Sequence, residues 1–283
     1  MLFARALAAF IAAGLLFPGS SSFAATAERQ QTVKAGDATI HVTIRGQGEP
    51  IVFIPSLGRG VEDFDDLSKR LVAAGYQAVL PDPRGMGRST GPLENITLHD
   101  LSEDVAVVIR LLGSGPVIVL GHAHGNRVAR MLAADHPELV RRTILLAAGG
   151  MVPRSRGTDV AFRRVFDPSI SEEDRLAAIQ RSFFAKGNDA KVWQKGWNFK
   201  VAAAQTAAVS KIPLSAWWSG GSAPILVLQA MEDAIAVPEN ARRLAAEFPT
   251  RVTVIDIPNS GHAMLPEQPD KIADAIVNWL RRH

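Results

Sequence analysis

Six short, continuously apolar runs constrain the fold of this chain more than any other feature of its sequence. They occupy residues 50–54, 77–80, 116–120, 143–147, 224–228 and 252–257. Strands that are buried on both faces of a parallel sheet have this composition, because helices cover both of their sides. Amphipathic helical patterns lie between the runs, so the alternation predicts an α/β fold with a doubly wound, mostly parallel sheet.

The clearest helical pattern follows the second run. Residues 98–112 carry an apolar stripe with spacings of three and four, and Thr97 with Asp100 forms a capping box in front of it. Weaker stripes of the same kind occupy residues 64–71 and 272–280. By contrast, residues 38–45 alternate apolar and polar side chains, which predicts a half-exposed strand at the edge of the sheet.

One segment, residues 151–222, interrupts the alternation. It has helical stretches but no strand pattern, and it holds four of the five tryptophans. Its 11 Lys and Arg against 6 Asp and Glu leave a local net charge of +5. A helical insertion rich in aromatics predicts a lid over a binding cleft, although tryptophans that attach the insertion to the core are the alternative. The predicted sheet domain then comprises residues 28–150 and 223–283.

Residues 1–27 have the layout of a secretory signal peptide. Arg5 supplies a positive charge, residues 6–17 form a 12-residue apolar run, and small-x-small triplets at 22–24 and 25–27 are candidate cleavage sites. The run is too short to span a bilayer as a permanent helix, and no cysteine is present to carry a lipid. We therefore predict export to the periplasm or secretion, with no stable membrane anchor. An uncleaved amphipathic anchor is the alternative.

Cysteine content and charge exclude several classes of protein. The 283 residues include no cysteine, which removes disulfides, thiolate metal sites and cysteine nucleophiles. The net charge is only +3, so nucleic-acid binding has no support. His122 and His124 have no third ligand at a spacing suited to zinc. We predict no metal and no cofactor, and a small-molecule substrate as the partner. The positive insertion favours a substrate that carries a carboxylate, although such charge is more often a solvated face.

Loops that follow the predicted strands carry the side chains that could take part in chemistry. Residues 121–125 (GHAHG) permit a sharp strand-to-helix turn with Ala123 at its apex, because small residues stand at both ends. Asp233 lies in the loop after the fifth run, and His262 lies in the loop after the sixth. A further loop, residues 82–89 (DPRGMGRS), follows the second run.

In the order and placement of these loops, the chain resembles lid-bearing α/β-hydrolases of the proline-iminopeptidase and haloperoxidase-like kind. The resemblance covers nearly the whole chain after the leader. It implies an α/β-hydrolase sheet with a triad acid at Asp233 and a triad base at His262. It also implies that the backbone N–H groups of Leu57 and His124 form an oxyanion hole. The family's serine nucleophile would stand at position 123, where this chain has Ala123.

The chain departs from the family in three places. Ala123 has no lone pair and cannot form an acyl-enzyme. Pro55 and Ser56 replace the usual His-Gly pair of the oxyanion loop, and Ala230 stands where the acid loop usually has glycine. Ser56 is a candidate displaced nucleophile, although a serine in a turn is more often structural.

Three explanations of Ala123 stay open on the sequence alone. The alanine is an engineered removal of a serine, or belongs to a natural binding protein, or belongs to a natural enzyme that needs no nucleophile. The altered oxyanion loop favours a natural alanine, because a single engineered change would leave the neighbouring loops ordinary. We expect a hydrolase of a small ester, lactone or amide that uses Asp233 and His262. The alternatives are a catalytically silent binding or sensor protein, and a nucleophile-free lyase or oxygenase with His262 as general base.

Overall fold

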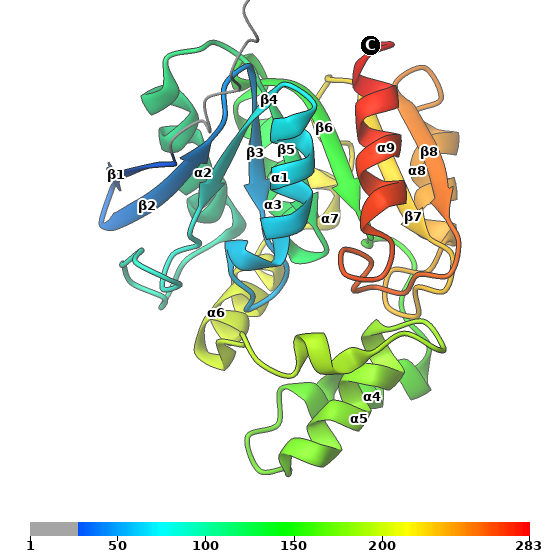
Figure 1. The fold of residues 1–283 in the computed structure, drawn as a ribbon. Coiled ribbons are helices and arrows are strands. Elements are labelled where there is room, and N and C mark those ends of the chain that lie inside the picture. Colours follow the sequence, from blue (N-terminus) through cyan, green and yellow to red (C-terminus); the bar gives the residue numbers. More distant parts are fainter. Residues whose placement is uncertain (1–27) are drawn as a thin grey trace, which may run out of the picture.

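An eight-stranded sheet forms the centre of the molecule (Figure 1). The computed structural model describes residues 28–283, so the predicted signal peptide lies outside the described residues. The strand order is β1-β2-β4-β3-β5-β6-β7-β8. The strands are β1 (Arg29–Ala35), β2 (Ala38–Arg45), β3 (Glu49–Ile54), β4 (Tyr76–Pro81), β5 (Val117–His122), β6 (Val140–Leu146), β7 (Ile225–Ala230) and β8 (Val252–Ile257).

The sheet is parallel from β4 through β8, and β2 runs antiparallel to both of its neighbours, β1 and β4. Each of the six apolar runs contributes a strand of the parallel part. The prediction of a doubly wound, mostly parallel α/β sheet is therefore confirmed.

The predicted edge strand is wrong in its position. Residues 38–45 form β2, but β2 is the second strand, and the edge is β1. The polar sequence of β1 gives no strand pattern, and backbone pairing with β2 along its whole length holds it in place. A turn at Gly36, whose φ of 56° suits glycine, joins the two strands.

Helices cover both faces of the sheet. They are α1 (Asp65–Ala73), α2 (Leu98–Leu112), α3 (His124–Asp135), α4 (Arg156–Val165), α5 (Glu172–Phe183), α6 (Phe199–Ser210), α7 (Leu214–Trp217), α8 (Glu239–Glu247) and α9 (Pro269–Leu280). Helices α1 and α9 pack on one face, and α2, α3 and α8 pack on the other. The capping box of Thr97 and Asp100 is confirmed at the start of α2. Within residues 28–283, no helix has the length and apolar character needed to cross a membrane.

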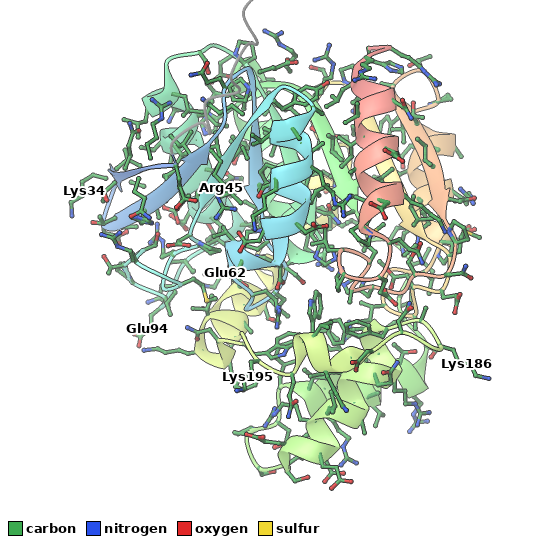
Figure 2. All side chains as sticks on the ribbon, viewed as in Figure 1. Lys34, Arg45, Glu62, Glu94, Lys186 and Lys195 are labelled. Carbon is green, nitrogen blue, oxygen red and sulfur yellow. The ribbon has the colours of Figure 1, made fainter. Side chains whose placement is uncertain are left out.

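The helical insertion, residues 151–222, runs from the end of β6 to the start of β7. It contains α4 to α7 and, within the described part of the chain, no strand. Figure 1 shows α4 and α5 lying below the ends of the strands, with α6 beside them. Two exposed lysines of the insertion, Lys186 and Lys195, point away from the molecule (Figure 2).

The tryptophans of the insertion divide between two apolar clusters. Trp217 and Trp218 belong to the main core beside α3 and attach the end of the insertion to the sheet domain. Trp193 and Trp197 pack with Phe183 in a separate cluster below the sheet. Attachment to the core is therefore the role of Trp217 and Trp218, whereas Trp193 and Trp197 belong to the apolar cluster of the insertion.

Candidate active site

The turn between β5 and α3 has a strained backbone at Ala123. Its φ is 52° and its ψ is −106°, a conformation that costs free energy for a residue with a Cβ. The turn is tight: a Cβ on Gly121 would lie 2.4 Å from the Gly125 oxygen, and a Cβ on Gly125 would lie 2.1 Å from the Ile54 oxygen. The two glycines are therefore required by space, and Ala123 is held at the apex with its methyl group facing a cavity.

The strain at the apex gives a stability prediction. Replacing Ala123 by glycine relieves the positive φ, so we expect the free energy of unfolding to rise by about 1 kcal/mol. Ala129, which is buried within α3, is the matched control. The change Ala129→Gly should lower the free energy of unfolding by about 1 kcal/mol, because glycine is a poor helix former. If urea denaturation shows that Ala123→Gly and Ala129→Gly lose the same free energy of unfolding, the apex stores no strain.

Asp233 and His262 form a buried hydrogen-bonded pair. The Nδ1 atom of His262 lies 2.9 Å and 3.0 Å from the two carboxylate oxygens of Asp233. The backbone N–H groups of Ile235 and Ala236 donate to the same carboxylate at 2.8 Å and 2.7 Å, which fixes its orientation. Since Nδ1 faces Asp233, the opposite ring atom, Nε2, is left to the cavity that His262 lines. A histidine oriented in this way can act as a general base.

The two predicted oxyanion donors also lie at this cavity. Leu57 and His124 line it from the loop after β3 and from the first position of α3. Among the described residues, neither backbone N–H has an acceptor, whereas the neighbouring Gly58 N–H donates to the Gln205 side chain at 2.8 Å. Two unused N–H groups beside a cavity can stabilise a developing negative charge on a bound carbonyl.

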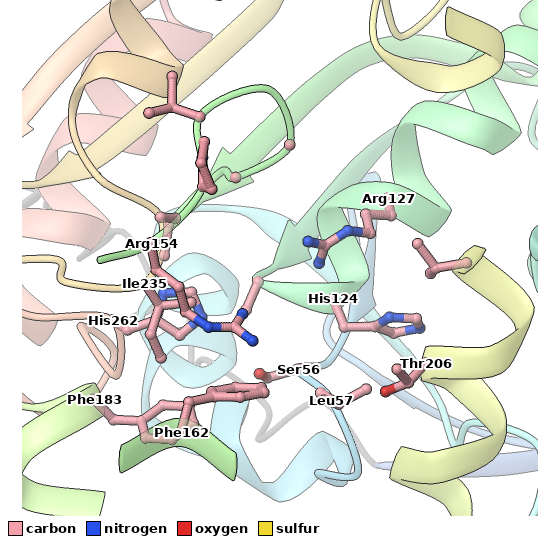
Figure 3. A pocket seen from close by; sticks show the side chains of 18 residues that line it. Ser56, Leu57, His124, Arg127, Arg154, Phe162, Phe183, Thr206, Ile235 and His262 are labelled. Carbon is pink, nitrogen blue, oxygen red and sulfur yellow. The ribbon is translucent and has the colours of Figure 1, made fainter. Parts of the chain in front are cut away.

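Ser56 lies in the same cavity but is not paired with the base. Its side chain is buried and its hydroxyl points toward the cavity (Figure 3). Within the described residues it forms no hydrogen bond with His262, which bonds through Nδ1 to Asp233 alone. A serine nucleophile needs a hydrogen bond to its base, so this arrangement does not favour Ser56 as the displaced nucleophile.

His122 and His124, on either side of Ala123, are buried and neutral. Burial lowers the pKa of His122 to about 3, and its Nε2 donates to the backbone oxygen of His262 at 2.8 Å. Burial, and secondarily the charge of Arg127, lower the pKa of His124 to about 3. His122 therefore supports the loop that carries the base. Within residues 28–283, no cluster of three or more His, Asp or Glu side chains could hold a metal ion.

The cavity has a volume of about 320 Å³ and is closed partly by the helical insertion. Phe162 of α4, Phe183 of α5, and Thr206 with Val209 of α6 line it opposite the strand ends. The ring centroid of Phe183 lies 5.6 Å from that of His262. Side chains of the insertion therefore line the same cavity as His262.

Sequence reasoning missed two arginines at this cavity. Figure 3 shows the side chains of Arg127 and Arg154 reaching into it from α3 and from the start of the insertion. The signal for Arg127 was its position three residues after His124, which places both residues on one side of the first turn of α3. Arg154 had no such signal, because its place depends on how the insertion packs.

The loop that carries His262 is fastened to the insertion. One carboxylate oxygen of Glu267 accepts from the Gly261 N–H at 2.7 Å, and the other accepts from the Ala185 N–H at 2.8 Å. The Ala263 N–H donates to the Phe183 oxygen at 2.8 Å. Two of these hydrogen bonds therefore join the end of α5 to the loop of His262, and the third, from Gly261 to Glu267, holds that loop together.

Comparisons with known proteins show the family to which this chain belongs. The profile of the alpha/beta hydrolase family matches residues 51–275. A relative from Acinetobacter baylyi named (E)-2-((N-methylformamido)methylene)succinate hydrolase is 25% identical over 259 residues, 87% of this chain and 95% of the relative. BpoC of Mycobacterium tuberculosis, which carries the name of a non-heme bromoperoxidase, is 26% identical over 250 residues, 83% of this chain and 95% of the relative.

Solved structures show the same fold. The esterase of Exiguobacterium antarcticum superposes with a TM-score of 0.78 at 20% identity, and the match covers 89% of this chain and 100% of the esterase. The family profile spans most of the sequence, and the resemblance to haloperoxidase-like members is confirmed. From the sheet order, the turn after β5 and these matches, this chain belongs to the α/β hydrolase family.

Proposed function

We propose that this protein is a hydrolase of a small ester, lactone or amide in which water takes the place of the serine nucleophile. The observation that supports the proposal most is the Asp233–His262 pair, intact and buried beside a cavity that also holds Ala123. The relative from Acinetobacter baylyi is named as a hydrolase, and the structural neighbour from Exiguobacterium antarcticum is an esterase. In this proposal a water takes the place of the serine hydroxyl and gives its proton to Nε2.

The proposed reaction needs only groups of this chain and water. His262 Nε2 accepts a proton from water while the water oxygen bonds to the substrate's carbonyl carbon. The carbonyl oxygen becomes negative and accepts from the N–H groups of Leu57 and His124. The bond to the leaving alcohol or amine then breaks, and His262 returns its proton to that group. Asp233 holds the Nδ1–H tautomer and stabilises the imidazolium in between.

Removal of the base tests this proposal. We expect His262→Ala to lower the turnover of p-nitrophenyl acetate and of a γ-lactone by about 10²-fold or more, the contribution of a positioned general base. His99, an exposed histidine of α2, gives the control His99→Ala, which should retain full turnover. The unaltered protein should also stay unlabelled by a fluorophosphonate probe, since no acyl-enzyme forms.

A silent binding protein is the second candidate, and Ala123 itself favours it. Saturable ligand binding without any turnover that depends on His262 would replace the hydrolase proposal with this one. Stoichiometric labelling by fluorophosphonate would also contradict water attack, and labelling at Ser56 would identify a displaced nucleophile. A lyase or oxygenase with His262 as base would require proton abstraction from a substrate carbon, which ester turnover does not report.

We also propose that the helical insertion acts as a lid and that the protein is exported. Phe162 and Phe183 at the cavity support the lid. The layout of residues 1–27 supports export. Edman sequencing of the protein recovered from the periplasm or medium should begin near Ala25 or Glu28.

A further inference from the structure

We propose that the cavity takes substrates with a carboxylate a few bonds from the scissile carbonyl, and that Arg127 binds this carboxylate. The inference rests on the proposed function, because it names the substrate class of the same site. It goes beyond the net charge of the insertion, whose lysines Lys186 and Lys195 point outward (Figure 2). It depends instead on whether two guanidinium groups at the cavity, those of Arg127 and Arg154, already have partners.

The cavity carries positive charge that no lining carboxylate balances. Arg127 and Arg154 are among its 18 lining residues, and none of the others is Asp or Glu. Arg154 has a partner outside the lining set, since its Nε donates to Asp159 at 2.8 Å, and its guanidinium lies 4.1 Å from the ring centroid of Phe162. The charge of Arg154 is therefore largely satisfied.

Arg127 has no such partner. Among the described residues its side chain forms no ion pair and donates no hydrogen bond, and its guanidinium lies 5.8 Å from the ring centroid of Trp217. Burial, and secondarily the charge of Arg154, lower the pKa of Arg127 to about 10, so it remains protonated at neutral pH. A guanidinium presents a planar fork of N–H donors that matches a carboxylate. A bound carboxylate would supply the missing partner.

The place of Arg127 on α3 sets the length of the substrate. Arg127 is the fourth residue of α3 and His124 is the first, so the two are about 4.5 Å apart along the helix axis and lie on the same side of its first turn. Side chains on a helix point back toward its N-terminus, so the guanidinium leans toward the turn at Ala123. A carbonyl held by the N–H groups of Leu57 and His124 would then lie only a few bonds from a carboxylate on Arg127.

Binding of two matched ketones tests the proposal without turnover. Levulinate has a carbonyl and a carboxylate separated by two methylene groups, and 2-pentanone carries a methyl group where levulinate has its carboxylate. Neither can be hydrolysed. By isothermal titration at pH 7, we expect the unaltered protein to bind levulinate at least about tenfold more tightly than 2-pentanone, as a charge-assisted pair provides. The variant Arg127→Met should remove this preference.

Two further variants separate recognition from folding. Arg243→Met changes an exposed arginine of α8 that pairs with Glu239, and it should keep the full preference for levulinate. Arg127→Lys keeps the charge without the planar fork, and it should keep part of the preference. The thermal midpoint of each variant is measured beside its affinity, so Arg127→Lys carries the test if Arg127→Met does not fold.

Several results would overturn the proposal. They are equal affinities for the two ketones, no saturable binding of levulinate, tighter binding of inorganic phosphate than of levulinate, or a folded Arg127 variant with an unchanged preference. Failure of the proposed function looks different. Levulinate binding that depends on Arg127, in a protein without turnover that depends on His262, would support this carboxylate site and contradict the hydrolase.

Discussion

Replacing Ala123 by serine is expected to raise kcat/KM for p-nitrophenyl acetate by about 10³-fold or more, because removal of the serine from a working triad costs more than this. The turn already holds position 123 in the strained conformation that exposes a side chain to the cavity. The Asp233–His262 pair stands ready to deprotonate a hydroxyl there. The variant should also react stoichiometrically with a fluorophosphonate probe at position 123.

The double change Ala123→Ser with His262→Ala is the matched control. It adds the same hydroxyl without its base, so both the gain in turnover and the labelling should disappear. An Ala123→Ser protein that folds but stays unlabelled would show that the pair is not aligned with the apex of the turn. In that case the cavity would be a binding site only.

Acid should destabilise the protein through the two buried histidines beside Ala123. The pKa of each falls to about 3 in the folded state, whereas an unfolded histidine titrates near 6.5. Below pH 6.5 the unfolded state therefore binds more protons than the folded state. Stability that is fully present above pH 6.5 is lost as the pH falls toward 3. The two groups together should lower the free energy of unfolding by about 2.7 kcal/mol per pH unit.

Urea denaturation between pH 4 and 6 measures this slope. His122→Gln and His124→Gln should each reduce it by about 1.4 kcal/mol per pH unit, whatever their effect on stability at pH 7. Carboxyl groups also titrate in this range, so the comparison is with the unaltered protein and with His99→Gln, which changes an exposed histidine. If His122→Gln and His124→Gln leave the slope unchanged, both histidines are already charged in the folded state.

The sequence predicted the sheet well because buried parallel strands need apolar side chains on both faces. It missed β1 because an edge strand can be held by backbone hydrogen bonds alone, so residues such as Gln30 and Gln31 carry no pattern. Without β1, residues 38–45 become the outermost strand, so their alternation predicts the edge of the sheet. In β2 it reflects a strand whose Ile40 and Val42 face the core under α2.

The sequence predicts those parts of the site that follow from the order of the strands in the sheet. Parallel strands bring their carboxyl ends together, so loops after β5, β7 and β8 meet, and the pairing of Asp233 with His262 follows. Arg154 and Phe162 could not be placed in this way. They belong to the insertion, whose position over the strand ends is fixed by tertiary packing and not by any local pattern.

The hydrogen bonds of Glu267 and Ala263 have a consequence for how this site could work. The bonds from the Ala185 N–H to Glu267 and from the Ala263 N–H to the Phe183 oxygen join the end of α5 to the loop of His262. A displacement of α5 large enough to admit a substrate would break these bonds and release the histidine from its place. The cavity therefore cannot be open on the side of α5 while His262 is held in place. A ligand that stabilises the closed arrangement would at the same time organise the base.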